Sequence, residues 1–226
     1  MFYNNYIIIK KARQADLTSC GRAHLHMCHD ITARNILLPR TRRGEIIMPK
    51  KVLIVSTSLR KKGNSDALAN AFMRGAENAG NSVEKVSLAD KSINFCKGCF
   101  ACRKTHECVI GDDANAIVDK MRAADVIVFA TPIYYYEMTG QMKTLLDRAN
   151  PLYFVDYSFR DVYLLTTAAD DDKETDARAV SGLEGWIECF PKARLAGKVF
   201  AGGVDGIGEI DGHPALNRAY EIGKSV

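Results

Sequence analysis

The stretch that most constrains the fold is residues 51–65, KVLIVSTSLRKKGNS. Its unbroken apolar run at residues 52–55 is short and β-branched, which is typical of a strand buried on both faces in a parallel sheet. Hydroxyl and basic side chains follow, then Gly63, and we expect Asn64 and Ser65 to cap a helix. The N–H groups and positive end of such a helix suit a phosphate. The stretch therefore predicts a strand, an anion-binding loop and a helix, with an ordinary solvated turn as the alternative.

Two well-known nucleotide fingerprints are absent from this loop. It has neither the G-x-G-x-x-G of a Rossmann dinucleotide site nor the G-x-x-x-x-G-K-[ST] of a P-loop NTPase. It resembles instead the first loop of the flavodoxin-like NAD(P)H-dependent FMN reductases, S-x-R-x-x-G-N-[ST]. The resemblance implies that four residues hold the phosphate of FMN: Ser58, Arg60, Asn64 and Ser65.

A second match to this family lies at residues 131–148, TPIYYYEMTGQMKTLLDR, directly after an apolar run. It is similar to the family segment P-[IV]-Y…K-x-x-[IFL]-D-R. An isoalloxazine ring needs aromatic contact and backbone N–H donors, which this segment can offer. The resemblance implies flavin contacts from four residues: Pro132, Ile133, Tyr134 and Tyr135. The alternative is that the three consecutive tyrosines pack beneath a surface loop.

Further matches extend the resemblance over residues 48–226, including GGVDGIGEI near the C-terminus. Thr167 and Ala168 take the position of the family's third flavin loop. We interpret Asp147 and Arg148 as an ion pair at a helix end with a structural role. The acidic run at residues 170–172 is expected to begin a solvated helix.

Four cysteines are crowded into one segment as C-x2-C-x2-C-x5-C: Cys96, Cys99, Cys102 and Cys108. Four thiolates at this density suit a [4Fe–4S] cluster or a zinc ion. The segment also resembles that of the iron–sulfur flavoproteins, in which a cluster exchanges single electrons with FMN. Because cluster-free reductases carry similar cysteines, we favour bare thiols, which could form a disulfide that folds a loop over the flavin edge.

The rest of the chain alternates between strand and helix patterns, which predicts βαβ crossovers and a doubly wound sheet. The expected strands are 52–55, 83–88, 125–131, 162–167 and 198–204. The expected helices are 65–79, 114–122, 139–150, 174–190 and 214–224. The resemblance to flavodoxins implies a five-stranded parallel sheet of order 2-1-3-4-5 in a three-layer α/β/α domain, with the ligand at the carboxyl ends of the strands.

Residues 1–47 differ in character from the domain expected at 48–226. Residues 1–51 hold ten Lys or Arg and three acids, a net charge of +7, while the remainder has 21 basic and 24 acidic residues, a net charge of −3. A secretory signal fits this basic extension poorly, because the apolar core at residues 7–9 is too short, whereas a transit peptide, a zinc site and a nucleic-acid arm are alternatives. We favour translated upstream sequence or a disordered segment. Flavodoxin-like chains commonly begin with a methionine a few residues before the first strand, and Met48 has that position here.

Together these features predict an FMN-dependent oxidoreductase that takes hydride from NAD(P)H and passes reducing equivalents to a quinone, a flavin or another small acceptor. No catalytic acid or base is expected, because the cofactor performs the chemistry. The alternative is an electron carrier, either flavodoxin-like or an iron–sulfur flavoprotein. A dedicated carrier is usually more acidic than this domain. We expect a cytoplasmic protein, because seven cysteines without a disulfide framework fit a reducing compartment. No apolar run is long enough to cross a membrane, so no membrane binding is expected. We also expect a homodimer or higher homo-oligomer that does not bind nucleic acid.

Overall fold

The computed structural model describes residues 48–226. Its centre is a five-stranded parallel sheet of order β2-β1-β3-β4-β5, which confirms the predicted fold class. The strands are β1 (Lys51–Ser56), β2 (Ser82–Ser87), β3 (Val126–Pro132), β4 (Asp161–Thr167) and β5 (Arg194–Ala201). The predicted extension at residues 1–47 lies outside the described residues, so its boundary stays a prediction.

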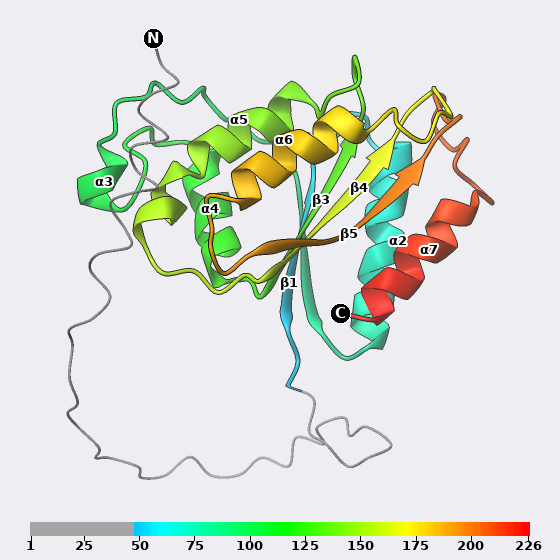
Figure 1. Cartoon of the computed structure of the whole chain (residues 1–226), viewed down its shortest axis with the longest axis horizontal. Helices are drawn as coiled ribbons and strands as arrows, with labels where there is room; N and C mark the ends of the chain where they lie inside the picture. The colour runs from blue at the N-terminus through cyan, green and yellow to red at the C-terminus, as the bar shows by residue number, and fades with distance from the viewer. Residues whose placement is uncertain (1–47) are drawn as a thin grey trace. The chain divides into compact units, whose positions relative to one another are not determined.

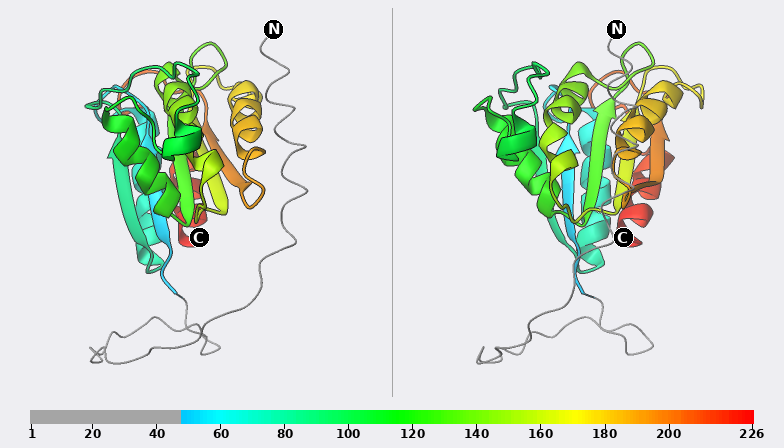
Figure 2. Two further views of the ribbon diagram at one scale, coloured as in Figure 1. Left: turned by 90° about the vertical axis from the view of Figure 1, so that its left-hand side faces the viewer. Right: turned by 60° about the vertical axis from the view of Figure 1, so that its left-hand side comes forward.

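Helices cover both faces of the sheet (Figure 1). They are α2 (Asn64–Asn78), α3 (Cys102–Thr105), α4 (Asp113–Ala123), α5 (Gly140–Arg148), α6 (Ala177–Ile187) and α7 (Pro214–Lys224), with the 3-10 helix η1 (Asn150–Phe154) after α5. Helices α4, α5 and α6 pack on one face, while α2 and α7 pack side by side on the other (Figure 2). The structure is therefore the expected three-layer arrangement.

Strand β1 shows why the apolar run has no polar alternation. Leu53 and Val55 belong to the core beneath α4, α5 and α6, whereas Val52 and Ile54 belong to the core beneath α2 and α7. Each of these four side chains is at most 2 % exposed. The strand between β2 and β3 is thus buried on both faces, as its composition predicts.

Three expected helix boundaries are wrong. Asn64 and Ser65 do not cap α2: its N-cap is Gly63, in an extended conformation, and they are the first two helical residues. Helix α5 stops at Arg148 and a 3-10 turn follows, because Pro151 has no N–H to continue the α-helical hydrogen bonds. The acidic run at 170–172 is exposed loop, and α6 begins only at Ala177.

None of the helices within residues 48–226 is both long enough and apolar enough to cross a membrane.

Candidate functional site

The loops that follow the strands lie at one edge of the sheet (Figure 2). Residues after the carboxyl ends of β1, β3, β4 and β5 line a pocket there. Nine of the ten residues that the sequence predicts as ligand contacts line it: Ser58, Arg60, Asn64, Ser65, Pro132, Ile133, Tyr134, Thr167 and Ala168. The parallel topology thus brings together three segments that are far apart in the chain. The roles of these residues remain predictions.

The first loop presents hydroxyl and amide groups at the start of α2. Ser58, Asn64 and Ser65 are buried, and the Ser58 hydroxyl accepts a hydrogen bond from the Arg60 amide at 3.2 Å. Three buried side-chain atoms within residues 48–226 lack a hydrogen-bond partner, and two of them belong to this loop: Asn64 Oδ1 and Ser65 Oγ. An unpaired buried polar atom costs free energy unless a ligand satisfies it. The Ser65 hydroxyl can donate to a phosphate group, which also accepts from guanidinium and backbone N–H donors, whereas Asn64 Oδ1 is an acceptor and fits a hydroxyl of the ligand.

A chain of threonine hydroxyls joins the first loop, which follows β1, to the second loop, which follows β3. The Thr139 hydroxyl donates to Thr57 Oγ1 at 3.1 Å, and the Thr131 hydroxyl donates to Thr139 Oγ1 at 3.4 Å. The Thr139 side chain also caps α5 by accepting from the Met142 amide at 3.2 Å. All three threonines are fully buried. This network fixes the second loop relative to the first.

The second loop ends in a tight turn that carries the three tyrosines. Tyr134 and Glu137 exchange two backbone hydrogen bonds, at 3.0 and 3.1 Å. Tyr135 and Tyr136 adopt the left-handed region, with φ of 52° and 66°. Tyr135 is 96 % exposed and does not line the pocket, so the structure does not bring it together with the other nine predicted residues.

Two of the backbone donors expected from the second loop are already engaged. The Ile133 amide donates to the Thr167 carbonyl at 2.8 Å, and the Tyr134 amide donates to Glu137. These two residues therefore offer side chains rather than free N–H groups to a ligand. Together with Pro132 and Ala168 they give this end of the pocket an apolar character that suits the face of a planar ring.

The fourth side of the pocket comes from the loop after β5, to which the sequence assigned no site residue. Val204, Asp205 and Ile207 line the pocket, and the Val204 amide donates to the Ala168 carbonyl at 2.9 Å. The signal was the glycine-rich run GGVDGIGEI, which overlaps the end of the last predicted strand at 198–204 but in fact follows β5, because that strand ends at Ala201. A run of this kind at the carboxyl end of a parallel strand is where such folds bind ligands.

The cysteine segment lies in the loop between β2 and α4. Its four cysteines are thiols and not disulfide-bonded; Cys96 and Cys99 are exposed, Cys102 is buried and Cys108 is half-buried. The Asn150 side-chain amide donates to Cys102 Sγ at 3.1 Å, and burial raises the pKa of this thiol. No three His, Cys, Asp or Glu side chains within residues 48–226 are gathered as metal ligands. The donor types suit a cluster, and whether these four cysteines hold one stays a prediction.

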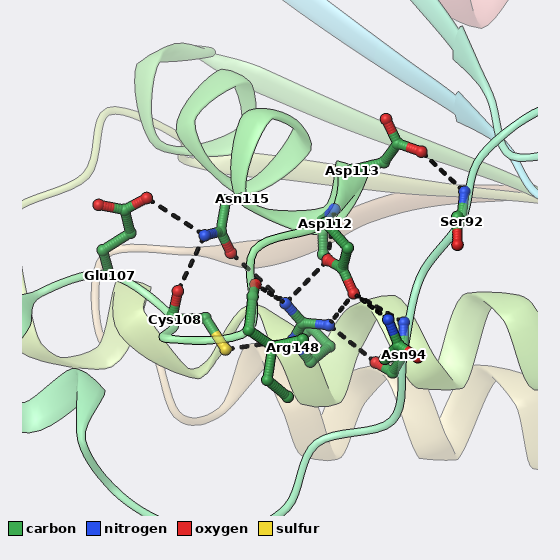
Figure 3. A network of polar contacts seen from close by, with 10 residues as sticks. Ser92, Asn94, Glu107, Cys108, Asp112, Asp113, Asn115 and Arg148 are labelled. Carbon is green, nitrogen blue, oxygen red and sulfur yellow. Dashed lines mark hydrogen bonds and ion pairs between the residues drawn. The ribbon is translucent and has the colours of Figure 1, made fainter.

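A buried arginine fixes the end of the cysteine segment (Figure 3). Arg148, fully buried at the end of α5, donates to both carboxylate oxygens of Asp112, at 2.7 and 2.9 Å. It also donates to the carbonyl oxygens of Asn94 and Ile110, and through Nε to Cys108 Sγ at 3.3 Å. The segment is therefore anchored on both sides of its cysteines.

The partner of Arg148 is not the one that the sequence suggested. The expected ion pair with Asp147 is wrong: Asp147 points outward and pairs with Lys143 at 2.7 Å. Neighbours in a helix point about 100° apart, so an arginine directed inward leaves Asp147 at the surface. Burial by itself raises the pKa of Asp112, but the hydrogen bonds from Arg148 and Asn94 hold that pKa well below its usual range.

Fold and pocket together define a flavodoxin-like α/β protein with a phosphate-compatible ligand site at the carboxyl ends of its strands. Residues 50–217 match the family model described as NADPH-dependent FMN reductase. The chain therefore belongs to the NADPH-dependent FMN reductase family, which confirms the family that its motifs resemble.

Several curated relatives carry the name iron-sulfur flavoprotein. One from Archaeoglobus fulgidus is 39 % identical over 101 residues, which is 45 % of this chain and 46 % of the relative. One from Methanocaldococcus jannaschii is 38 % identical over 45 % of this chain and 53 % of its own length. The chain thus spans about half the length of these relatives. Among solved structures, an NAD(P)H:quinone oxidoreductase from Methanothermobacter marburgensis has a TM-score of 0.61 at 16 % identity, covering 79 % of this chain and 97 % of that one.

Proposed function

We propose that the protein binds FMN in this pocket and uses NAD(P)H to reduce a small acceptor such as a quinone or a flavin. The observation that carries the proposal is the convergence of three family-matched loops on one pocket that contains two unpaired buried polar atoms. Bound FMN would supply hydride-accepting and hydride-donating chemistry, and the chain would hold and orient it. Membership of the NADPH-dependent FMN reductase family supports this activity.

The first loop would hold the phosphate. The hydroxyl groups of Ser58 and Ser65 and the N–H groups of the first turn of α2 are the neutral donors, and Arg60 is the cationic one. The second and third loops would bind the ring, since Pro132, Ile133 and Ala168 form the apolar part of the pocket. A pocket polar at one end and apolar at the other matches the two ends of FMN.

Flavin titrations test the binding step. We expect FMN to bind far more tightly than riboflavin, which lacks the phosphate, with both measured by quenching of flavin fluorescence. Arg60→Ala removes a charge-assisted contact and should weaken FMN binding by about 1–3 kcal/mol with little effect on riboflavin. Lys61→Ala is the matched control, because Lys61 is exposed in the same loop and does not line the pocket. Equal losses in the two variants, or no FMN binding by the wild type, would refute the proposal.

The redox step needs a separate assay. FMN-loaded protein should oxidise NADH or NADPH steadily when a quinone or free flavin is present and stop when the acceptor is withheld. A protein that accepts electrons from NAD(P)H only once, and releases them only to another protein, would instead be an electron carrier. The modest net charge of −3 over residues 52–226 favours the enzyme over a carrier.

An iron–sulfur flavoprotein is the second candidate function, favoured by the names of the relatives and by the four-cysteine segment. Our proposal expects protein purified without oxygen to lack iron and sulfide, and Cys99→Ser to keep FMN and the quinone reductase rate. About four irons per chain, lost in Cys99→Ser, would establish the second candidate, because a [4Fe–4S] cluster needs all four thiolates.

A further inference from the structure

The loop after β5, residues 202–209, forms one wall of the pocket and is here named the closing loop. It is tied to the loop after β4 through backbone hydrogen bonds from Val204 to the Ala168 carbonyl at 2.9 Å and from Gly203 to the Asp170 carbonyl at 3.4 Å. A Cβ on Gly202 would lie 2.6 Å from the Asp171 Cα, so only glycine allows this approach. The closing loop is thus a built part of the site.

The closing loop also holds two side chains of the first loop. Arg60 Nη1 donates to the Asp205 carbonyl oxygen at 2.9 Å and lies 3.9 Å from the Asp205 carboxylate. Asn64 Nδ2 donates to the Gly206 carbonyl oxygen at 2.9 Å. Arg60 and Asn64 are two of the four residues expected to meet a phosphate. Two consecutive carbonyls of the closing loop therefore set the orientation of those two side chains.

Glu209, at the end of the closing loop, stabilises this loop by hydrogen bonds to its backbone. Its Oε2 accepts from the Asp205 amide at 2.7 Å, and its own amide donates to the Gly206 carbonyl at 3.2 Å. Hydrogen bonds from the backbone N–H groups of Asp205 and Gly206 lower the pKa of Glu209. A Cβ on Gly206 would lie 2.7 Å from Glu209 Oε1, so a larger residue at position 206 would displace the carboxylate from its present place. Glu209 therefore contacts Asp205 and Gly206, the two residues whose carbonyls accept from Arg60 and Asn64.

We propose that Glu209 is a positioning residue for phosphate recognition: it holds the closing loop so that the Asp205 and Gly206 carbonyls orient Arg60 and Asn64 before the ligand arrives. The inference rests on the proposed function. The Arg60 side chain is 54 % exposed, so without these carbonyls it would sample many rotamers and lose that freedom on binding. Ordering it beforehand removes this cost from ligand binding.

The ratio of riboflavin Kd to FMN Kd measures this role, because a general loss of pocket structure would weaken both flavins alike. Glu209→Ala should lower the ratio about three- to tenfold, the effect of one long side chain left unordered. Glu209→Gln should keep most of the ratio, since an amide oxygen can still accept from the Asp205 amide. Asp211→Asn is the matched control: this exposed acid of the same connection makes no hydrogen bond through its side chain within residues 48–226, and the ratio should not change.

A double mutant shows whether Glu209 acts through Arg60. If it does, Glu209→Ala should change the ratio little once Arg60→Ala is present. An unchanged ratio in Glu209→Ala, an equal fall in Asp211→Asn, or full additivity with Arg60→Ala would each overturn the inference.

Amide hydrogen exchange of the ligand-free protein separates this inference from the proposed function. Glu209→Ala should speed exchange at the Asp205 amide, which loses its acceptor, and leave the β1 amides unchanged. Unchanged exchange at the Asp205 amide would refute the role of Glu209 in ordering the loop, whichever ligand the protein binds. Wild-type protein that binds neither flavin would refute the proposed function and the phosphate role of Glu209 with it, while the exchange experiment would still decide whether Glu209 orders the loop.

Discussion

At the scale of single residues, the buried Arg148 joins three segments that are separate in sequence: α5, the chain at Asn94 and the chain from Cys108 to Asp112. Arg148→Met, which keeps the side-chain volume, leaves the Asp112 carboxylate buried without its cation. The free energy of unfolding should fall by about 3–5 kcal/mol, measured by urea denaturation. Lys143→Ala removes the exposed ion pair on the same helix and should cost no more than about 0.5 kcal/mol. Similar losses in both variants would contradict the assignment.

The same pair predicts a pH dependence. Because Arg148 and Asn94 hold the pKa of Asp112 below its unfolded value, the pair contributes stability that is fully present above the unfolded pKa of about 4 and is lost as the pH falls through the lower native-state pKa. The stability difference between wild type and Arg148→Met should therefore be constant near neutral pH and shrink below about pH 4. Denaturation at several pH values measures it. A difference that grows in acid would exclude this mechanism.

A substitution of Ser65 distinguishes between two roles of its side chain, capping α2 and binding the ligand. Its buried hydroxyl is unpaired and it is not the N-cap of α2. Ser65→Ala should therefore raise the free energy of unfolding of the ligand-free protein, by about 1 kcal/mol, and weaken FMN binding by a similar amount. Thermal unfolding with and without FMN measures both effects. A stability loss of about 1 kcal/mol without ligand would instead indicate a cap.

At the scale of elements, α2 and α7 pack so closely that glycine is required on both. A Cβ on Gly223 of α7 would overlap the backbone of Phe72 in α2, and one on Gly75 would overlap Tyr220. Gly223→Ala should cost about 1–3 kcal/mol through overpacking. Gly185→Ala is the control, because it lies in α6 with open space around its Cβ position and should gain about 0.5–1 kcal/mol of helix stability. Equal effects at the two glycines would contradict this packing.

At the scale of the whole molecule, the family match lies entirely after Met48, at residues 50–217. We therefore predict that a chain beginning at Met48 folds and binds FMN with the affinity of the full-length protein. Flavin titration and thermal unfolding of the two proteins side by side provide the measurement. A tenfold loss of FMN affinity on removing residues 1–47 would show that the basic extension takes part in the function.

The sequence by itself determined the alternation of strands and helices, the doubly buried strands and nine of the residues that meet in the pocket. The strands and helices depend on local periodicity, while the pocket residues come from the resemblance of three loop motifs to the FMN reductases, and a parallel sheet places the carboxyl ends of its strands at one edge. Only the tertiary structure decided that Arg148 pairs with Asp112, that Asn64 reaches Gly206 instead of capping α2, and that the closing loop completes the pocket. Such contacts join residues up to 145 positions apart, as between Arg60 and Asp205. No local pattern encodes them, because they depend on which loops the packed sheet brings within hydrogen-bonding distance.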